Sequence, residues 1–139
     1  MFPIAFAPGS IADRQLQPDD IAGITDLYPA AGIESSTGSI SGRITKGGRG
    51  VFGAHIVAVA LRRGTIVGGF TLNTEGEFAI AGLTPGPYVL RAEPLDDADP
   101  DGFFSGDVDV EFQVTYAPMV VIAPEGGGSI DVMIEVRPK

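Results

Sequence analysis

The stretch GEFAIAGLTPGPYVLRAEPL (residues 76–95) decides the fold that this sequence predicts. Apolar residues alternate with other residues in its first half, which indicates a strand with one face toward a core. The TPG triplet in the middle has the composition of a tight turn, and a second apolar run follows it. We therefore expect two consecutive strands joined by that turn, with Phe78, Ile80 and Leu83 pointing inward.

Short units of the same kind lie on both sides of this pair. With 20 Gly and 11 Pro in 139 residues, turn-forming residues separate the apolar runs. Seven or eight such strands in about 100 residues are typical of an antiparallel β-sandwich of prealbumin or immunoglobulin size. The flanking units that we expect are residues 39–45, 53–63, 64–73, 109–117, 119–123 and 129–137.

The segment PDDIAGITDLY (residues 18–28) predicts one short helix before the strands. It starts with Pro, which suits the first helical position, and two Asp follow in the first turn, where they complement the helix dipole. Ile21, Ile24, Leu27 and Tyr28 recur at helical spacing. A helix this short is not stable alone, so we expect the stripe to be buried against another surface.

The composition excludes several classes of function. A net charge of −9 argues against binding to nucleic acid or to anionic membranes, because both need a basic face. The chain has no Cys, so it forms no disulfide and does no thiol chemistry. No apolar run approaches the roughly 18 residues that cross a bilayer, and the N-terminus does not have the pattern of a signal peptide.

The stretch LQPDDIAGITDLYP (residues 16–29) resembles the last helix of the catalytic domain of matrixins, the collagenase-like branch of the metzincin zinc proteases. In that family a Met-x-Pro turn lies shortly before this helix, and Met1-Phe2-Pro3 stands at the corresponding place. The matching helix residues are Leu16, Asp19, Asp20, Ile21, Gly23, Ile24, Leu27 and Tyr28.

The matrixin resemblance implies roles for several residues. Met1 would be the Met-turn residue beneath the zinc site, and Pro3-Ile4-Ala5 would form a wall of the pocket that takes the substrate side chain after the scissile bond. Family members often have an aromatic residue where this chain has Ala5. Asp19 and Asp20 would tie the helix to the mature N-terminus and to the Met-turn.

The zinc-binding motif of the family is missing from this chain. Matrixins bind zinc through H-E-x-x-H-x-x-G-x-x-H, whereas the only His here is His55, within an expected strand. We expect the motif upstream of Met1, so that the chain is a truncated piece or has a start assigned at the Met-turn. The chain by itself is then not an enzyme, and its parent is a zinc metalloendopeptidase.

Residues 39–95 resemble a carboxypeptidase regulatory-like domain. Such domains are prealbumin-like β-sandwiches attached to secreted enzymes and surface proteins, usually as accessory or stalk modules. The matching residues are Gly42, Gly53, Ala54, Gly76, Phe78, Gly82, Leu83, Pro85, Gly86 and Tyr88.

These patterns predict a domain organisation and a function. We expect the end of a metzincin-like catalytic domain at 1–29, a linker at 30–38 and the β-sandwich at 39–139. The leading interpretation is the C-terminal portion of a secreted bacterial-type matrixin, whose sandwich serves its upstream catalytic domain or binds a protein or glycan. The alternative is a free-standing adhesion or carbohydrate-binding module at the cell surface or in the medium.

An acidic loop raises the question of a calcium site. Asp97, Asp99, Asp101 and Gly102 follow the D-x-D-x-D-G pattern in which alternating carboxylates converge on one Ca²⁺ ion. Position twelve of such a loop is Val108 and not Glu, and no helices flank it. A solvated acidic loop and a calcium loop both remain open.

The remaining candidates are single residues that favour structural roles. We expect His55 to be a partly buried strand residue and not a metal ligand. Aromatic residues at 88, 103, 104 and 116 suggest a carbohydrate platform, but in a chain without Trp we favour packing in the core or at an edge.

Overall fold

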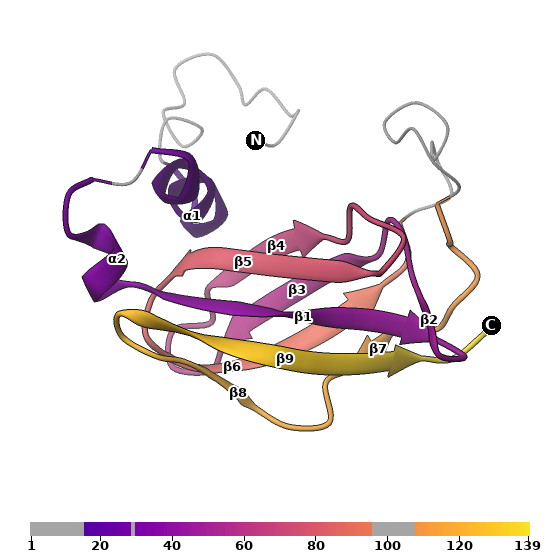
Figure 1. The fold of residues 1–139 in the computed structure, drawn as a ribbon. Coiled ribbons are helices and arrows are strands. Elements are labelled where there is room, and N and C mark those ends of the chain that lie inside the picture. Colours follow the sequence, from indigo (N-terminus) through magenta and orange to yellow (C-terminus); the bar gives the residue numbers. More distant parts are fainter. Residues whose placement is uncertain (1–15, 29, 96–107) are drawn as a thin grey trace, which may run out of the picture.

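The computed structural model describes residues 16–28, 30–95 and 108–139, and these form two β-sheets packed face to face with a helix across one end (Figure 1). The expected fold class, a β-sandwich preceded by one short helix, is confirmed. The elements are α1 (Pro18–Leu27), α2 (Ile33–Ser36), β1 (Gly38–Lys46), β2 (Arg49–Gly50), β3 (His55–Ala60), β4 (Ile66–Phe70), β5 (Glu77–Leu83), β6 (Gly86–Glu93), β7 (Thr115–Tyr116), β8 (Val121–Ala123) and β9 (Gly127–Val136).

The first sheet is built around β1. This strand pairs antiparallel with β5 and with the short β2, and it pairs with β9 on its other side. The β1–β9 pair is parallel, which corrects the expectation of a wholly antiparallel sandwich. Parallel pairing is possible because the chain crosses to the second sheet between these strands, and such a pair needs a long connection.

The second sheet has the order β4-β3-β6, and all of its pairs are antiparallel. The outer side of β6 is shared by two short strands, β8 near its start and β7 near its end. The expected strand at 109–117 is therefore mostly irregular. It is reduced to β7 and to an isolated bridge between Phe112 and Pro138.

The core lies between the two sheets and confirms the predicted inward residues. Phe78, Ile80 and Leu83 on β5 are all buried, as are Ile44 on β1 and Leu90 on β6. Each buried aliphatic or aromatic side chain contributes about 1.5–3 kcal/mol relative to an exposed one. The burial of these alternating side chains therefore provides the main stabilisation of the sandwich.

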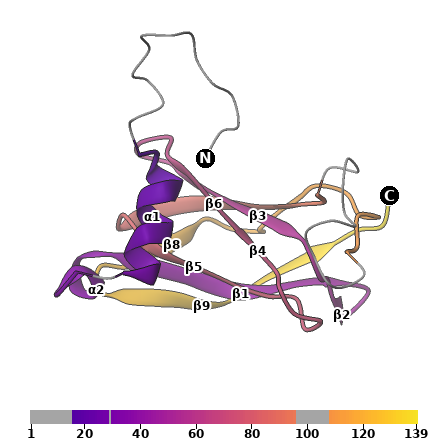
Figure 2. The ribbon, with the colours of Figure 1, turned by 90° about the horizontal axis from the view of Figure 1, so that it is seen from above.

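Helix α1 packs differently from the expectation. It lies against β5 and β4 at one end of the sandwich, as Figure 2 shows from above. The side chain that it buries is Ala22, which is 5% exposed, and the backbone of Ala22 lies beside Gly82 on β5. The predicted stripe of larger residues is not the buried face, because a close approach of helix backbone to strand favours small residues at the contact.

The segment expected to be a linker at 30–38 contains structure. The helical turn α2 begins after Gly32, which has a φ of 83°, and Thr37 follows it with a backbone bond to the Ile33 carbonyl. Gly38 is already the first residue of β1. Among the described residues, no helix is long and apolar enough to cross a membrane.

Candidate functional site

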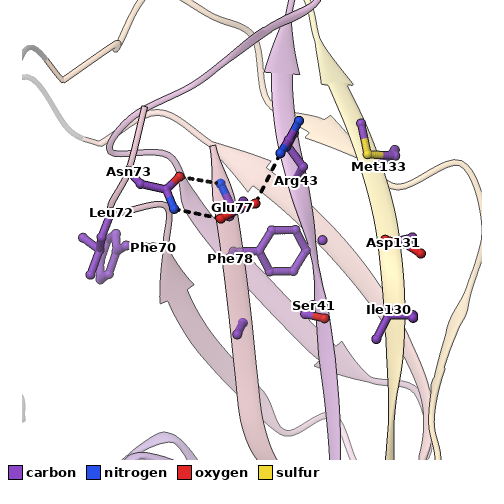
Figure 3. A pocket seen from close by; sticks show the side chains of 12 residues that line it. Ser41, Arg43, Phe70, Leu72, Asn73, Glu77, Phe78, Ile130, Asp131 and Met133 are labelled. Atoms are coloured by element: carbon purple, nitrogen blue, oxygen red, sulfur yellow. Dashed lines mark hydrogen bonds and ion pairs between the residues drawn. The ribbon is translucent and has the colours of Figure 1, made fainter. Parts of the chain in front are cut away.

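A hollow lined by described residues lies on the solvent face of the first sheet (Figure 3). We call it the sheet groove; its volume is about 800 Å³. The side chains come from the three long strands of that sheet and from the end of β4, so the tertiary structure alone brings them together. Its lining residues are Ser41, Gly42, Arg43, Phe70, Leu72, Asn73, Glu77, Phe78, Ala79, Ile130, Asp131 and Met133.

A hydrogen-bonded carboxylate marks one end of the sheet groove. One oxygen of Glu77 pairs with Arg43 at 3.2 Å, and the other accepts a bond from the Asn73 side-chain amide at 3.1 Å. The Asn73 side-chain oxygen in turn accepts the backbone N–H of Glu77 at 3.0 Å. Because Asn73 caps the start of β5 in this way, the Glu77 carboxylate is held in place at the surface. The ion pair itself is exposed and contributes little to stability.

The other wall of the sheet groove is shaped by a β-bulge in β9. Between Ile40 and Gly42 the register with β1 shifts by one residue, and Asp131 takes a φ of 60°, the one positive φ of a non-Gly residue among those described. A bulge adds one residue and so changes which face the following side chains occupy. As a result Ile130 and Met133, three residues apart, are both exposed, at 72% and 51%.

Phe70, which lines the sheet groove, also contacts a cluster of polar side chains on the second sheet. The ring of Phe70 stacks on His55, with centroids 4.9 Å apart and planes inclined by 25°. The Nδ1 atom of His55 lies 2.9 Å from a carboxylate oxygen of Glu93, whose other oxygen pairs with Arg91 at 2.7 Å. His55 is thus a half-buried strand residue that contacts Phe70 and Glu93, in line with its expected structural role.

A second hollow, which we call the edge groove, lies on the other side of β9 and has a volume of about 440 Å³. Residues 117–122, which include the start of β8, form one wall, and residues 129–133 of β9 form the other. Apolar side chains dominate both walls, and Asp131 is the one charged lining residue. Ile130, Asp131 and Met133 belong to both grooves, so the two hollows adjoin along β9.

Most of the site residues that the sequence singled out are not among the residues that the structure describes. Met1, Pro3, Ile4 and Ala5 of the expected Met-turn, and Asp97, Asp99 and Asp101 of the expected calcium loop, lie outside the described residues. At the helix start, the Asp20 carboxylate accepts the Gln17 N–H at 3.1 Å, which caps the first turn of α1.

Of the aromatic residues considered for a carbohydrate platform, Tyr88 and Tyr116 are described, and they lie in different surroundings. Tyr88 is buried, and its hydroxyl donates to the Thr84 carbonyl at 2.8 Å. Burial raises the pKa of this phenol, and the nearby Arg63 partly offsets the rise. Tyr116 is exposed at the edge of the second sheet.

The two grooves have linings of one kind. They combine apolar walls with a few fixed polar groups, the usual composition of binding surfaces. Among the described residues no three His, Cys, Asp or Glu side chains come together as metal ligands would. These surfaces were not predicted from the sequence. An unbroken alternation would place Ile130 on the inward face with Val132 and Ile134, but the bulge turns the side chain of Ile130 to the solvent face.

Comparisons with known proteins show no family for this chain. No family model and no curated protein matches the chain. Among solved structures, the TIE protein of Bacillus anthracis matches with a TM-score of 0.49 at 11% identity, over 74% of this chain and 17% of that one. The pilus adhesin RrgA of Streptococcus pneumoniae matches with a TM-score of 0.37 at 18% identity, over 62% of this chain and 10% of that one.

A leucine-rich repeat protein of Bacteroides thetaiotaomicron matches with a TM-score of 0.39 at 7% identity, over 76% of this chain and 14% of that one. The chain therefore corresponds to less than a fifth of the length of each of these proteins.

Proposed function

We propose that this chain is the non-catalytic C-terminal portion of an exported bacterial zinc metalloprotease of matrixin type, with its β-sandwich acting as an accessory or binding module. The observation that carries the proposal is the exposed apolar face of α1. The four side chains of the predicted stripe, at positions 21, 24, 27 and 28, are 48% to 79% exposed, although Ala22 fixes the helix on the sandwich.

An apolar helix face of this kind is costly to leave in water, and contiguous exposed apolar surface marks contact sites. The sandwich occupies one face of α1, and a second body on the other face would remove the stripe from water. The residues of the stripe are also those that match the last matrixin helix, whose partner in that family is the catalytic domain. An upstream catalytic domain is therefore the occupant that we propose, and zinc would bind there and not in this chain.

The test compares this chain with a longer reading frame. The genomic DNA before the Met1 codon is searched for an in-frame H-E-x-x-H-x-x-G-x-x-H, and the extended protein is assayed for peptide cleavage with zinc and with a chelator. We expect chelator-sensitive cleavage by the extended form and none by the 139-residue chain. An in-frame stop codon with a ribosome-binding site close to Met1 would refute the protease parent.

The proposed contact between α1 and the upstream catalytic domain is tested by two substitutions in the extended protein. Ile24→Asp should lower its thermal stability or activity, whereas Val114→Asp, at a similarly exposed apolar residue just before β7, should not. Equal effects of both variants would contradict the proposed covering of α1.

A second candidate is a free-standing adhesion or glycan-binding module. The sheet groove favours it, because that hollow is open to solvent and its walls need no upstream domain. Binding to immobilised glycans or matrix proteins by the 139-residue chain, lost on Arg43→Ala and kept on Arg62→Ala, would support this function over the protease parent.

A further inference from the structure

The strand β9 has one free side. It pairs with β1 along its length, and no other described strand pairs with it. On the other side of β9, hydrogen bonds between described residues occur only near the two ends of the strand. The Ser129 hydroxyl donates to the Ile122 carbonyl at 2.6 Å, and the Gln113 N–H donates to the Arg137 carbonyl at 2.8 Å. Backbone groups on such an edge are available to another chain.

The edge groove lies alongside this free side. Figure 1 shows β9 at the margin of its sheet with β8 close by. The groove walls carry five exposed apolar side chains. Contiguous exposed apolar surface of this kind often marks a binding site. These side chains belong to Met119, Val120, Ile122, Ile130 and Met133.

The bulge adds polar anchors to the apolar walls. Ile130 and Asp131 have no register partner on β1, because the bulge adds a residue to β9 at this point. The Asp131 carboxylate is the one charged side chain of the edge groove. A ligand that fits must therefore offer backbone hydrogen bonds, apolar side chains and a positive charge.

We infer that β9 binds an extended peptide segment of a partner protein as an added strand, with apolar side chains at alternate positions in the edge groove and a Lys or Arg beside Asp131. Strand addition uses main-chain hydrogen bonds for affinity and side-chain pockets for specificity. A basic partner segment complements a chain of net charge −9, whereas a second copy would bring a second net charge of −9 and a second Asp131. The inference does not depend on what precedes α1.

Bulges and charges on edge strands also serve to prevent pairing with other chains. In that case β9 would bind no peptide, and the apolar side chains of the edge groove would be exposed to solvent without a binding role. The two roles of the bulge predict opposite results in a selection experiment.

The probe is a random twelve-residue peptide library displayed on phage, selected on the immobilised 139-residue chain and counter-selected on the Ile130→Lys variant. We expect enriched peptides with alternating apolar residues and a basic residue. Their synthetic forms should perturb the NMR amide signals of residues 130–135. Ile130→Lys should weaken their binding at least about tenfold, whereas Ile66→Lys, at an exposed apolar residue on β4, should leave it unchanged.

Two further variants separate strand addition from other binding. Methylating alternate backbone nitrogens of the peptide should abolish binding if its N–H groups pair with β9. Asp131→Asn should weaken binding of the basic peptide and spare a peptide in which Gln replaces the basic residue. No enrichment over the counter-selection, undiminished binding of the methylated peptide, or self-association of the chain through β9 would each overturn the inference.

Discussion

Gly42 on β1 lies directly against the backbone of Val132 on β9. A Cβ atom at Gly42 would stand 2.7 Å from the carbonyl carbon of Val132, and still closer to its oxygen. This contact falls where the register of the parallel pair shifts, so the bulge at Asp131 and the absence of a side chain at Gly42 depend on each other.

Replacing Gly42 by Ala should therefore destabilise the sandwich. The added methyl group has to push β9 away from β1, and overpacking of this kind costs about 1–3 kcal/mol. The free energy of unfolding from urea titrations measures the loss. Gly23→Ala is the matched control, because nothing lies within 4 Å of its Cβ position, and there the free energy of unfolding should stay equal or rise.

The buried hydroxyl of Thr71 holds the start of β3 to the end of β4. It donates to the Val51 carbonyl at 2.6 Å and accepts the Ala54 N–H at 2.9 Å. Thr71→Val keeps the shape but leaves both backbone groups without this partner, so we expect a loss of about 2 kcal/mol in the free energy of unfolding. The exposed Thr74→Val should change it by less than about 0.5 kcal/mol. A loss of equal size at both positions would contradict the assigned bonds.

The carboxylate of Glu135 predicts a pH dependence at the acidic end. Hydrogen bonds from the Thr45 hydroxyl and the Gly48 N–H lower the pKa of Glu135 in the folded chain. Its ionised form therefore stabilises the fold above the unfolded pKa of about 4.3, and this contribution is lost as the pH falls through the lower folded value.

Glu135→Gln should remove that part of the acid sensitivity. Urea unfolding midpoints are measured between pH 2 and pH 7, a range of about five units that spans both protonation states of the group. As the pH is lowered, the midpoint should fall less steeply in the variant than in the wild type. Glu125→Gln, in the turn before β9, controls for the loss of one negative charge. If both variants follow the wild-type curve, the Thr45 and Gly48 bonds do not act on Glu135 as we describe.

The two faces of α1 should respond differently to polar substitutions. Ala22→Gln places a long polar side chain between the helix and β5, and it should release α1 and speed amide hydrogen exchange over residues 18–27. Leu27→Gln, on the exposed face, should leave the exchange rates of this chain nearly unchanged. Fast exchange in the Leu27 variant alone would mean that the stripe, and not Ala22, holds the helix.

The sequence anticipated the elements better than their partners. The expected unit at 76–83 became β5, with its predicted inward residues in the core, and the unit at 87–95 begins within β6. The helix at 18–28 also forms, but the spacing of Ile21 and Leu27 says only that they share a face. Which face is buried depends on how closely the helix backbone approaches Gly82.

The candidate surfaces were not predictable in the same way. Arg43, Glu77 and Met133 are separated widely along the chain and meet only because β1 lies between β5 and β9. The break in alternation at Asp131 leaves no clear mark in the sequence, because Asp is compatible with a positive φ but does not require one.

The sequence by itself indicated that the chain forms short strands and that Phe78, Ile80 and Leu83 face the core, because a period of two in hydrophobicity is a local property of the chain. Only the tertiary structure decided that β9 runs parallel to β1, that α1 turns its larger side chains to solvent, and that the two grooves adjoin along β9. These features depend on strand pairing and backbone approach between residues far apart in sequence, and local patterns do not encode them.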